Sequence, residues 1–166
     1  YHSITENGAQ CIVVNDGGDM DLTIPHVSYT PNMGYGYALK VGVDKVNTRL
    51  VCMADGDGQH TFQDIQRLYT VFNAIEDCAM VIGMRWNLKE SKIRFLGRKV
   101  LNFIASIFSR HYLPDLNSGL RIVRRDLLVA YRSILCDSFS FTTSLTMSVL
   151  TDGYKFAYIP ISVLDR

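Results

Sequence analysis

The chain has 166 residues, of which 48% are hydrophobic and 20% charged, and its formal net charge is +1. This composition is typical of a folded domain that buries a core, and it excludes a disordered chain. The apolar stretches are shorter than the roughly 20 residues of a membrane-spanning helix, and the N-terminus lacks the layout of a signal peptide. From the length and the composition we expect a single domain over residues 1–166.

The charged residues are distributed unevenly. Residues 1–84 hold 4 Lys/Arg and 10 Asp/Glu, residues 85–132 hold 11 and 3, and residues 133–166 hold 2 and 3. This division fits either a cleft that binds a metal cation beside anionic groups or merely an uneven solvated surface. The 4 cysteines show no metal-type pairing, so we interpret them as core residues in a reducing compartment.

Strand and helix patterns alternate along the chain. Short apolar runs that end in turns predict buried strands over residues 11–14, 50–54 and 79–83. Residues 36–46 and 62–75 have helical spacing, and Thr61 is suited to cap the second helix. The alternation predicts an α/β fold with a mostly parallel sheet and flanking helices. Ligands gather at the carboxyl ends of such strands, where Asp16 and Asp55 are found.

An amphipathic helix is expected over residues 93–108. Its apolar face holds Ile93, Leu96, Val100, Leu101, Ile104, Ile107 and Phe108. Its opposite face holds Arg94, Arg98, Lys99, Asn102 and Ser106. Such a helix either lies in a membrane interface that contains anionic lipid or packs its apolar face on the core with the basic face in water.

The turn "ADGDGQH" at residues 54–60 follows a buried strand. Asp55, Asp57 and Gln59 offer hard oxygen ligands to one small cation, and the neighbouring glycines leave room for a bulky ligand. Mg²⁺ or Mn²⁺ held by one or two carboxylates usually takes other ligands from substrate phosphates, which favours a diphosphate substrate. The alternative is an ordinary Asp-Gly turn. A calcium loop is excluded because His60 and Gln66 stand where Gly and Glu are required.

Two further segments suggest anion binding. In "NMGYG" at residues 32–36, the glycines either expose amide N–H groups to a phosphate or let the next helix pack closely on the sheet. Arg110, Arg121 and Arg124 bracket "PDLNSGLRIVRR". Because guanidinium groups fit phosphate oxygens bidentately, this cluster favours an acceptor that carries a phosphate.

Six segments in order resemble the landmarks of family 2 glycosyltransferases. They are "VVNDGGDMD" (13–21), "NMGYGYALKVG" (32–42), "MADGDGQH" (53–60), "VIGMR" (81–85), "DLNSGLRIVRRD" (115–126) and "GYKFAYIPISVLDR" (153–166). The likeness is strongest to the polyprenyl-phosphate branch typified by dolichyl-phosphate mannose synthase. The resemblance implies a GT-A fold, a nucleotide-diphosphate sugar donor, a divalent metal and inversion at the anomeric carbon.

The resemblance also implies roles for individual residues on the donor side. Asn15 and Asp16 would contact the nucleoside, although Asn15 departs from the family's usual Asp. Asp55, Asp57 and Gln59 match the motif that binds the metal and the diphosphate. Asp57 is the ligand expected first, and it would act in catalysis through the metal.

On the acceptor side, the resemblance places phosphate-binding arginines in the segment around residues 115–126. Arg121 is the most specific match, and Arg110, Arg124 and Ser118 complete the expected acceptor site. Asp115 would orient the acceptor or assist the metal. A phosphate monoester needs no strong general base, whereas a sugar hydroxyl would need one, with Asp115 as the first choice.

The chain also departs from the family pattern, since the family's first strand, with its Pro-x-Tyr-Asn-Glu-Glu type turn, is missing. We therefore expect a glycosyltransferase domain truncated at both ends, in which the donor sugar passes to polyprenyl phosphate. The alternatives are a polysaccharide acceptor or a noncatalytic fragment that binds nucleotide sugars. We expect a cytoplasmic location, peripheral on the cytoplasmic face of a membrane, with no nucleic-acid partner.

Overall fold

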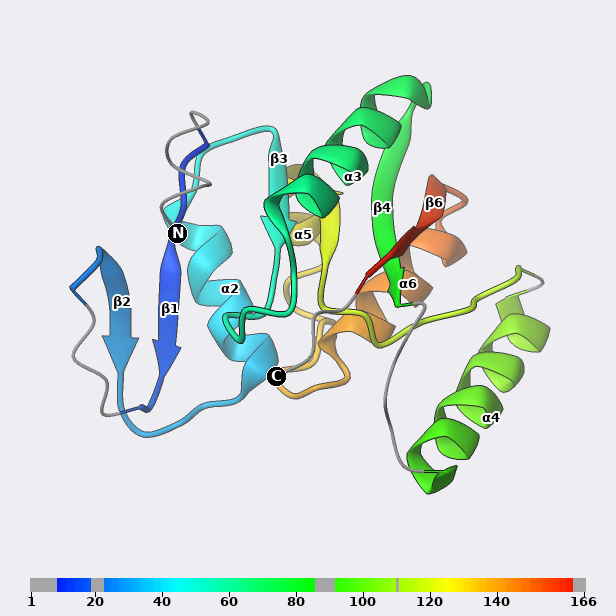
Figure 1. The fold of residues 1–166 in the computed structure, drawn as a ribbon, viewed down its shortest axis with the longest axis horizontal. Coiled ribbons are helices and arrows are strands. Elements are labelled where there is room, and N and C mark those ends of the chain that lie inside the picture. Colours follow the sequence, from blue (N-terminus) through cyan, green and yellow to red (C-terminus); the bar gives the residue numbers. More distant parts are fainter. Residues whose placement is uncertain (1–8, 19–22, 86–91, 110, 163–166) are drawn as a thin grey trace.

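A computed structural model of the chain describes residues 9–18, 23–85, 92–109 and 111–162 (Figure 1). These residues form strands and helices that alternate through the first part of the chain. In chain order the elements are β1 (Val13–Asp16), β2 (His26–Tyr29), α2 (Tyr35–Lys45), β3 (Leu50–Met53), α3 (Phe62–Ala74), β4 (Cys78–Arg85), α4 (Lys92–Ser109), β5 (Arg121–Arg124), α5 (Arg125–Ala130), α6 (Phe141–Thr151) and β6 (Lys155–Ile161).

The elements predicted from local patterns are present. The three predicted strands correspond to β1, β3 and β4, and the two predicted helices correspond to α2 and α3. Thr61 caps α3 as expected, since its hydroxyl accepts a hydrogen bond from the backbone N–H of Asp64. That bond satisfies one of the N–H groups that a helix leaves open at its start.

The strands form two sheets among the described residues. β1 and β2 are parallel and form a pair, while the larger sheet has the order β3-β5-β4-β6. Here the expectation of a mostly parallel sheet is wrong, because β5 runs antiparallel to both β3 and β4. Only β4 and β6 are parallel in this sheet. The antiparallel strand brings Arg121 beside Met53, and thus beside the acidic turn that follows β3.

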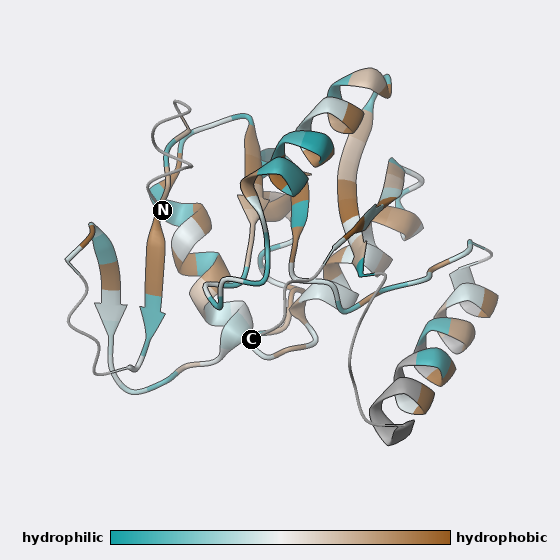
Figure 2. Ribbon diagram, viewed as in Figure 1, coloured by the Kyte–Doolittle hydropathy of each residue, from teal (hydrophilic) through white to brown (hydrophobic). Residues whose placement is uncertain are grey.

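The core lies on both faces of β4. Met80 and Ile82 belong to one buried cluster, which also includes Leu128 of α5 and Leu145 of α6. Val81 belongs to a second cluster, with Leu68 and Phe72 of α3. Successive side chains of a strand point to opposite faces, so the apolar run of β4 fills two layers. Figure 2 shows hydrophobic residues along β4 and hydrophilic residues on the outward side of α3.

The helix α4 forms as expected, but its orientation corrects one of the two interpretations of it. Leu96, Val100 and Ile107 of the predicted apolar face are exposed, whereas Asn102 of the polar face is buried. These three side chains of the predicted apolar face therefore do not pack on the core. α4 lies apart from the strands in Figure 1 and contacts α6. Among the residues described, no helix is long and apolar enough to cross a bilayer.

Candidate functional site

The first carboxylate of the acidic turn lies against the loop that precedes β5. A Cβ atom built on Gly119 would lie 2.5 Å from Oδ2 of Asp55. Such a distance is too short for two non-bonded atoms, so only glycine at this position leaves the carboxylate where it is. Two sequence motifs, "ADGDGQH" and "NSG", thus meet at one place, although 64 positions separate Asp55 from Gly119 in the sequence.

The second carboxylate is held by its own turn. Oδ1 of Asp57 accepts a hydrogen bond of 3.1 Å from the backbone N–H of Gln59. Residues 54–58 are exposed, so the turn is open to solvent. Nδ1 of His60 is buried with no hydrogen-bond partner in the described part of the chain. No group of three or more His, Cys, Asp and Glu side chains suited to a metal ion occurs among the described residues.

The start of α2 connects the acidic turn to β1. Oδ1 and Oδ2 of Asp16 accept hydrogen bonds of 2.7 and 2.9 Å from the backbone N–H groups of Met33 and Gly34. The next residue is Tyr35, and its burial and the neighbouring Asp55 carboxylate raise the pKa of its hydroxyl. The hydroxyl therefore stays protonated at neutral pH and can donate to Asp55. Asp16 thus fixes the backbone that places Tyr35 beside the acidic turn.

The glycine-rich segment "NMGYG" packs closely instead of presenting an open loop. The N–H groups of Met33 and Gly34 are already used by Asp16, and Gly34 has a φ of 105°, which favours glycine. A Cβ atom on Gly36 would collide with the backbone of Cys136 and Asp137. The close-packing interpretation is therefore the one that fits, although the helix packs here on residues 136–137 instead of the sheet.

The predicted nucleoside contacts lie at the carboxyl end of β1. Asn15 closes its own turn, because Nδ2 donates to the carbonyl of Gly18 at 2.7 Å and Oδ1 accepts from the N–H of Gly18 at 3.2 Å. Burial and the nearby Asp16 carboxylate raise the pKa of Tyr29, at the end of β2, to about 12. The side chains of Asn15 and Asp16 thus shape this end of the sheet, and their contact with a nucleoside stays a prediction.

Asp115 is fully buried in an ion pair that no sequence pattern predicted. Its Oδ2 accepts from Nε of Arg85 at 2.8 Å and from the Arg85 backbone N–H at 3.2 Å. Its Oδ1 accepts from a terminal nitrogen of Arg85 at 2.8 Å. This bidentate geometry is the strongest that the two groups can form. Arg85 ends β4, and the only sequence signal for it was its place after a buried strand in "VIGMR".

Ser118 and Arg121 are also buried, which corrects the expectation that they contact an acceptor directly. The Ser118 hydroxyl donates to the carbonyl of Gly83 at 2.5 Å. The Arg121 guanidinium is 0% exposed, and it donates to the carbonyls of Leu116, Ser118 and Thr142 and to the Thr146 hydroxyl. Burial lowers the pKa of Arg121 to about 10, so the group stays charged at neutral pH. It ties the "NSG" loop to α6.

The arginines expected around an acceptor phosphate do not gather at one place. Arg124 lies at the opposite end of β5 from Arg121, because Arg121 pairs with Met53 and Arg124 with Leu50. Arg124 is bound bidentately to Asp126 and lies over the ring of Tyr154, with 5.8 Å from the guanidinium carbon to the ring centre. This contradicts its predicted role. Arg110 lies outside the described residues.

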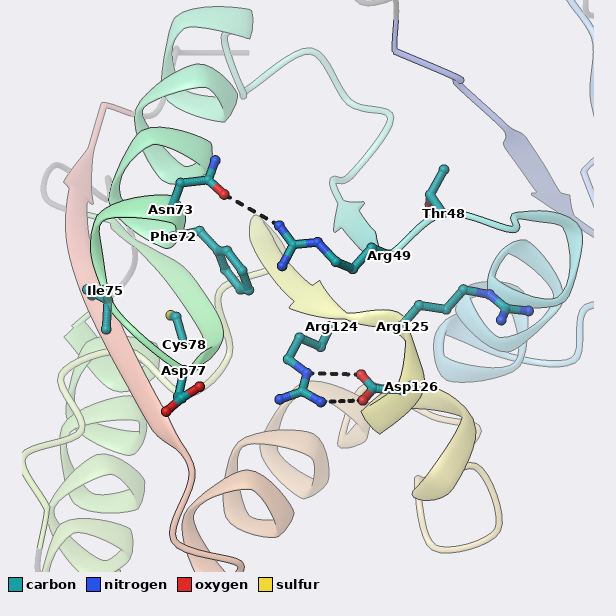
Figure 3. Close-up of a pocket in the computed structure, with 10 residues that line it drawn as sticks. All are labelled: Thr48, Arg49, Phe72, Asn73, Ile75, Asp77, Cys78, Arg124, Arg125 and Asp126. Atoms are coloured by element: carbon teal, nitrogen blue, oxygen red, sulfur yellow. Dashed lines mark hydrogen bonds and ion pairs between the residues drawn. The ribbon is translucent and has the colours of Figure 1, made fainter.

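A hollow lies at this opposite edge (Figure 3), and no residue of the acidic turn lines it. It has a volume of about 580 Å³ and is lined by Arg49, Phe72, Asn73, Arg124 and Asp126, among others. Arg49 lies 6.0 Å from the Phe72 ring centre. Its cations and acids are mixed, so its size alone does not make it the chemical site. The acidic turn beside Gly119 remains the candidate site because the sequence motifs converge there.

Comparison with known proteins defines the family. Residues 2–132 match the model of glycosyl transferase family 2, and the chain therefore belongs to that family. The protein MJ1222 of Methanocaldococcus jannaschii is 24% identical over 182 residues, which cover 98% of this chain and 73% of that protein.

The fold is similar to that of solved glycosyltransferases. Glucosyl-3-phosphoglycerate synthase from Mycobacterium tuberculosis, in complex with Mn²⁺, UDP-glucose and phosphoglyceric acid, matches with a TM-score of 0.73 at 17% identity, over 93% of this chain and 60% of that chain. The same enzyme with UDP matches with a TM-score of 0.71, 17% identity and the same shares. The chain thus spans about three fifths of these proteins. The predicted GT-A fold is confirmed, while the polyprenyl-phosphate branch stays a prediction.

Proposed function

We propose that this chain is the core of a metal-dependent, inverting glycosyltransferase that moves a sugar from a nucleotide diphosphate to an acceptor carrying a phosphate. The observation that carries the proposal is the close contact between the Asp55 carboxylate and the backbone of Gly119. That contact joins the acidic turn, suited to a metal and a diphosphate, to the loop that the family resemblance assigns to the acceptor. Donor and acceptor would therefore meet at the carboxyl end of β3.

The residues of the acidic turn fit a hard divalent cation. Asp55 and Asp57 supply carboxylate oxygens and Gln59 an amide oxygen, the donor types that Mg²⁺ and Mn²⁺ prefer. The exposed turn leaves space for phosphate oxygens and water to complete the coordination. When bound, the metal supplies the positive charge that stabilises the departing nucleoside diphosphate. The Mn²⁺ and UDP-glucose in the complex of the Mycobacterium tuberculosis enzyme support this assignment.

The other residues of the site orient these groups. Tyr35, held in place by Asp16 through the preceding backbone, donates its hydroxyl proton toward Asp55 and fixes the carboxylate. Arg121 and Ser118 hold the loop on which Asp55 rests, so we assign them positioning roles. Asn15 and Asp16 are proposed to border the nucleoside at the end of β1.

The acceptor proposed for this site is polyprenyl phosphate. A phosphate monoester is ionised at neutral pH and attacks without a strong base, which agrees with an Asp115 carboxylate that is fully buried against Arg85. The Arg85 side chain is 21% exposed, so we propose that it faces the acceptor phosphate while Asp115 orients it. Phosphoglyceric acid, which is bound in the complex of the Mycobacterium tuberculosis enzyme, also carries a phosphate. The competing functions are transfer to a polysaccharide and donor binding without transfer.

The donor assignment is tested by calorimetric titration with UDP-glucose, UDP-GlcNAc and GDP-mannose, each with Mn²⁺ and with EDTA. We expect one donor to bind and the binding to vanish with EDTA. Asp57→Ala should abolish this binding, whereas Asp126→Ala, an exposed acid at the opposite edge of the sheet, should leave it unchanged. Metal-independent binding, or equal affinity in Asp57→Ala, would refute the metal site.

The acceptor assignment is tested by following labelled sugar into organic solvent with polyprenyl phosphate and into the aqueous phase with phosphoglyceric acid or a polysaccharide. Arg85→Gln should raise the KM for the phosphate acceptor by about tenfold or more, as expected for loss of a charge-assisted bond. Donor affinity should stay the same. Transfer to a saccharide alone would refute the phosphate acceptor, and donor binding without any transfer would favour the noncatalytic alternative.

A further inference from the structure

The helix α4 presents a continuous apolar stripe to solvent. Leu96, Val100, Phe103 and Ile107 are exposed by 63%, 48%, 66% and 58%. Their spacing of four, three and four residues places them on one side of the helix. Tyr112, just after the helix, is 82% exposed. Scattered apolar residues are normal on a protein surface, but a stripe of this length on one element marks an interaction surface.

The inward side of α4 is polar because it completes the hydrogen bonds of the following loop. The Asn102 amide donates to the carbonyl of Pro114 at 2.5 Å, and its oxygen accepts from the N–H of Leu116 at 3.4 Å. The Ser106 hydroxyl accepts from the N–H of Leu113 at 3.0 Å. These bonds fix which side of the helix faces the protein. The apolar stripe is therefore directed outward by specific contacts of the opposite side.

The charges of α4 select the kind of surface that the stripe fits. By sequence, residues 92–110 contain Lys92, Arg94, Arg98, Lys99 and Arg110 and no Asp or Glu. The same apolar spacing would also suit a second copy of the helix, but two such helices would bring together like charges with no acidic partner. An anionic lipid surface attracts Lys and Arg and accepts apolar side chains just below its headgroups.

We propose that α4 docks on an anionic membrane surface through Leu96, Val100, Phe103 and Ile107. The bonds of Asn102 and Ser106 couple this helix to the loop at residues 113–116, which leads to Gly119 beside Asp55. Docking would thus bring the candidate site to the headgroup level of the bilayer. The inference rests on the helix alone, so it can fail or succeed independently of the proposed transferase activity.

The test is co-sedimentation of the chain with vesicles of phosphatidylcholine alone and of phosphatidylcholine mixed with phosphatidylserine. We expect binding to the mixed vesicles and its loss at high salt. Phe103→Ser and Ile107→Ser should each weaken binding by about tenfold or more, from the apolar surface that no longer enters the lipid. Lys99→Gln should weaken it about fivefold. The matched control is Ile134→Ser, because Ile134 is 62% exposed but lies outside α4.

The test distinguishes membrane docking from misfolding and from association with a second copy. Because the substituted residues are exposed, circular dichroism should show unchanged folding, and Lys99→Gln provides a second variant that removes no apolar contact. Absence of binding to the mixed vesicles, or equal weakening by Ile134→Ser, would overturn the proposal. Sedimentation velocity without lipid gives the remaining outcome: a dimer that Phe103→Ser dissociates would assign the stripe to a second copy and also overturn membrane docking.

Discussion

The two edges of the four-stranded sheet carry similar charged residues in opposite surroundings. At the edge where β3 ends, Asp115 and Arg121 are 0% exposed. Arg85 forms an ion pair with Asp115, and protein carbonyls accept hydrogen bonds from Arg121. At the other edge, the side chains of Arg124 and Asp126 pair while 33% and 60% exposed. Both edges are rich in arginine, yet only the first has its arginines fixed by several buried partners.

This difference shows what fixes the geometry of the candidate site. A buried charge must have its hydrogen bonds satisfied, because an unpaired one is very costly in the protein interior. The satisfied bonds of Arg121 therefore determine the path of the loop that carries Gly119, on which Asp55 rests. An exposed pair costs little to break and fixes little. Paired substitutions at the two edges test this contrast.

The largest effect is expected from replacing the two arginines of β5 in parallel. Arg121→Met removes one donor from each of four buried acceptors, so it should lower the free energy of unfolding by about 3 kcal/mol or more. Arg124→Met removes an exposed pair and should cost less than about 1 kcal/mol. Urea denaturation followed by circular dichroism measures both. Equal losses would contradict the contrast between the edges.

The next effect concerns the two carboxylates. Asp115→Asn leaves the Arg85 guanidinium with a weaker, neutral partner and should cost about 2 kcal/mol, whereas Asp126→Asn should cost less than about 1 kcal/mol. A double-mutant cycle between Arg85→Met and Asp115→Asn should give a coupling energy of about 1 kcal/mol or more. Additive losses would show that the pair does not act as a unit.

Local patterns predicted much of the fold, and their limits are visible in particular residues. β3 and α3 begin where the apolar runs predicted, because apolar periodicity and the Thr61 cap are properties of neighbouring residues. The antiparallel course of β5 was missed, since it depends on how the chain returns after α4. The spacing of apolar residues likewise predicted the apolar face of α4 but not its outward direction, which Asn102 and Ser106 decide through distant partners.

The candidate site, like the fold, was predicted from the sequence only in part. The acidic turn is a short local motif, and "ADGDGQH" gave Asp55 and Asp57 directly. Arg85 was missed and Arg121 was given the wrong surroundings, because no local pattern records the pairing of Arg85 with Asp115 or the bond from Arg121 to the carbonyl of Thr142. Residue type alone made Arg121 and Arg124 look alike, and only the register of β5 separates them.

A smaller effect is expected from adding one methyl group beside the acidic turn. Gly119→Ala would push away the Asp55 carboxylate, a movable group at the end of an exposed side chain, so the stability should change by less than about 1 kcal/mol. Affinity for Mn²⁺ with the donor should nevertheless fall about tenfold, since the displaced ligand no longer fits. Gly56→Ala in the same turn meets no atom within 4 Å and serves as the control. Equal affinity of the two variants would place the metal away from Asp55.

The smallest effect is the pH dependence of the exposed pair. The hydrogen bond from Arg124 lowers the pKa of Asp126 below the ordinary value of an aspartate. A lowered folded-state pKa means that the pair stabilises the protein above the unfolded pKa and that this contribution is lost as the pH falls through the folded value. Because Asp126 is 60% exposed, the contribution should be less than about 1 kcal/mol. Urea midpoints of the wild type and Asp126→Asn should therefore differ slightly at neutral pH and converge in acid. A difference that persists below the folded pKa would mean that the carboxylate stabilises this edge by something other than its charge.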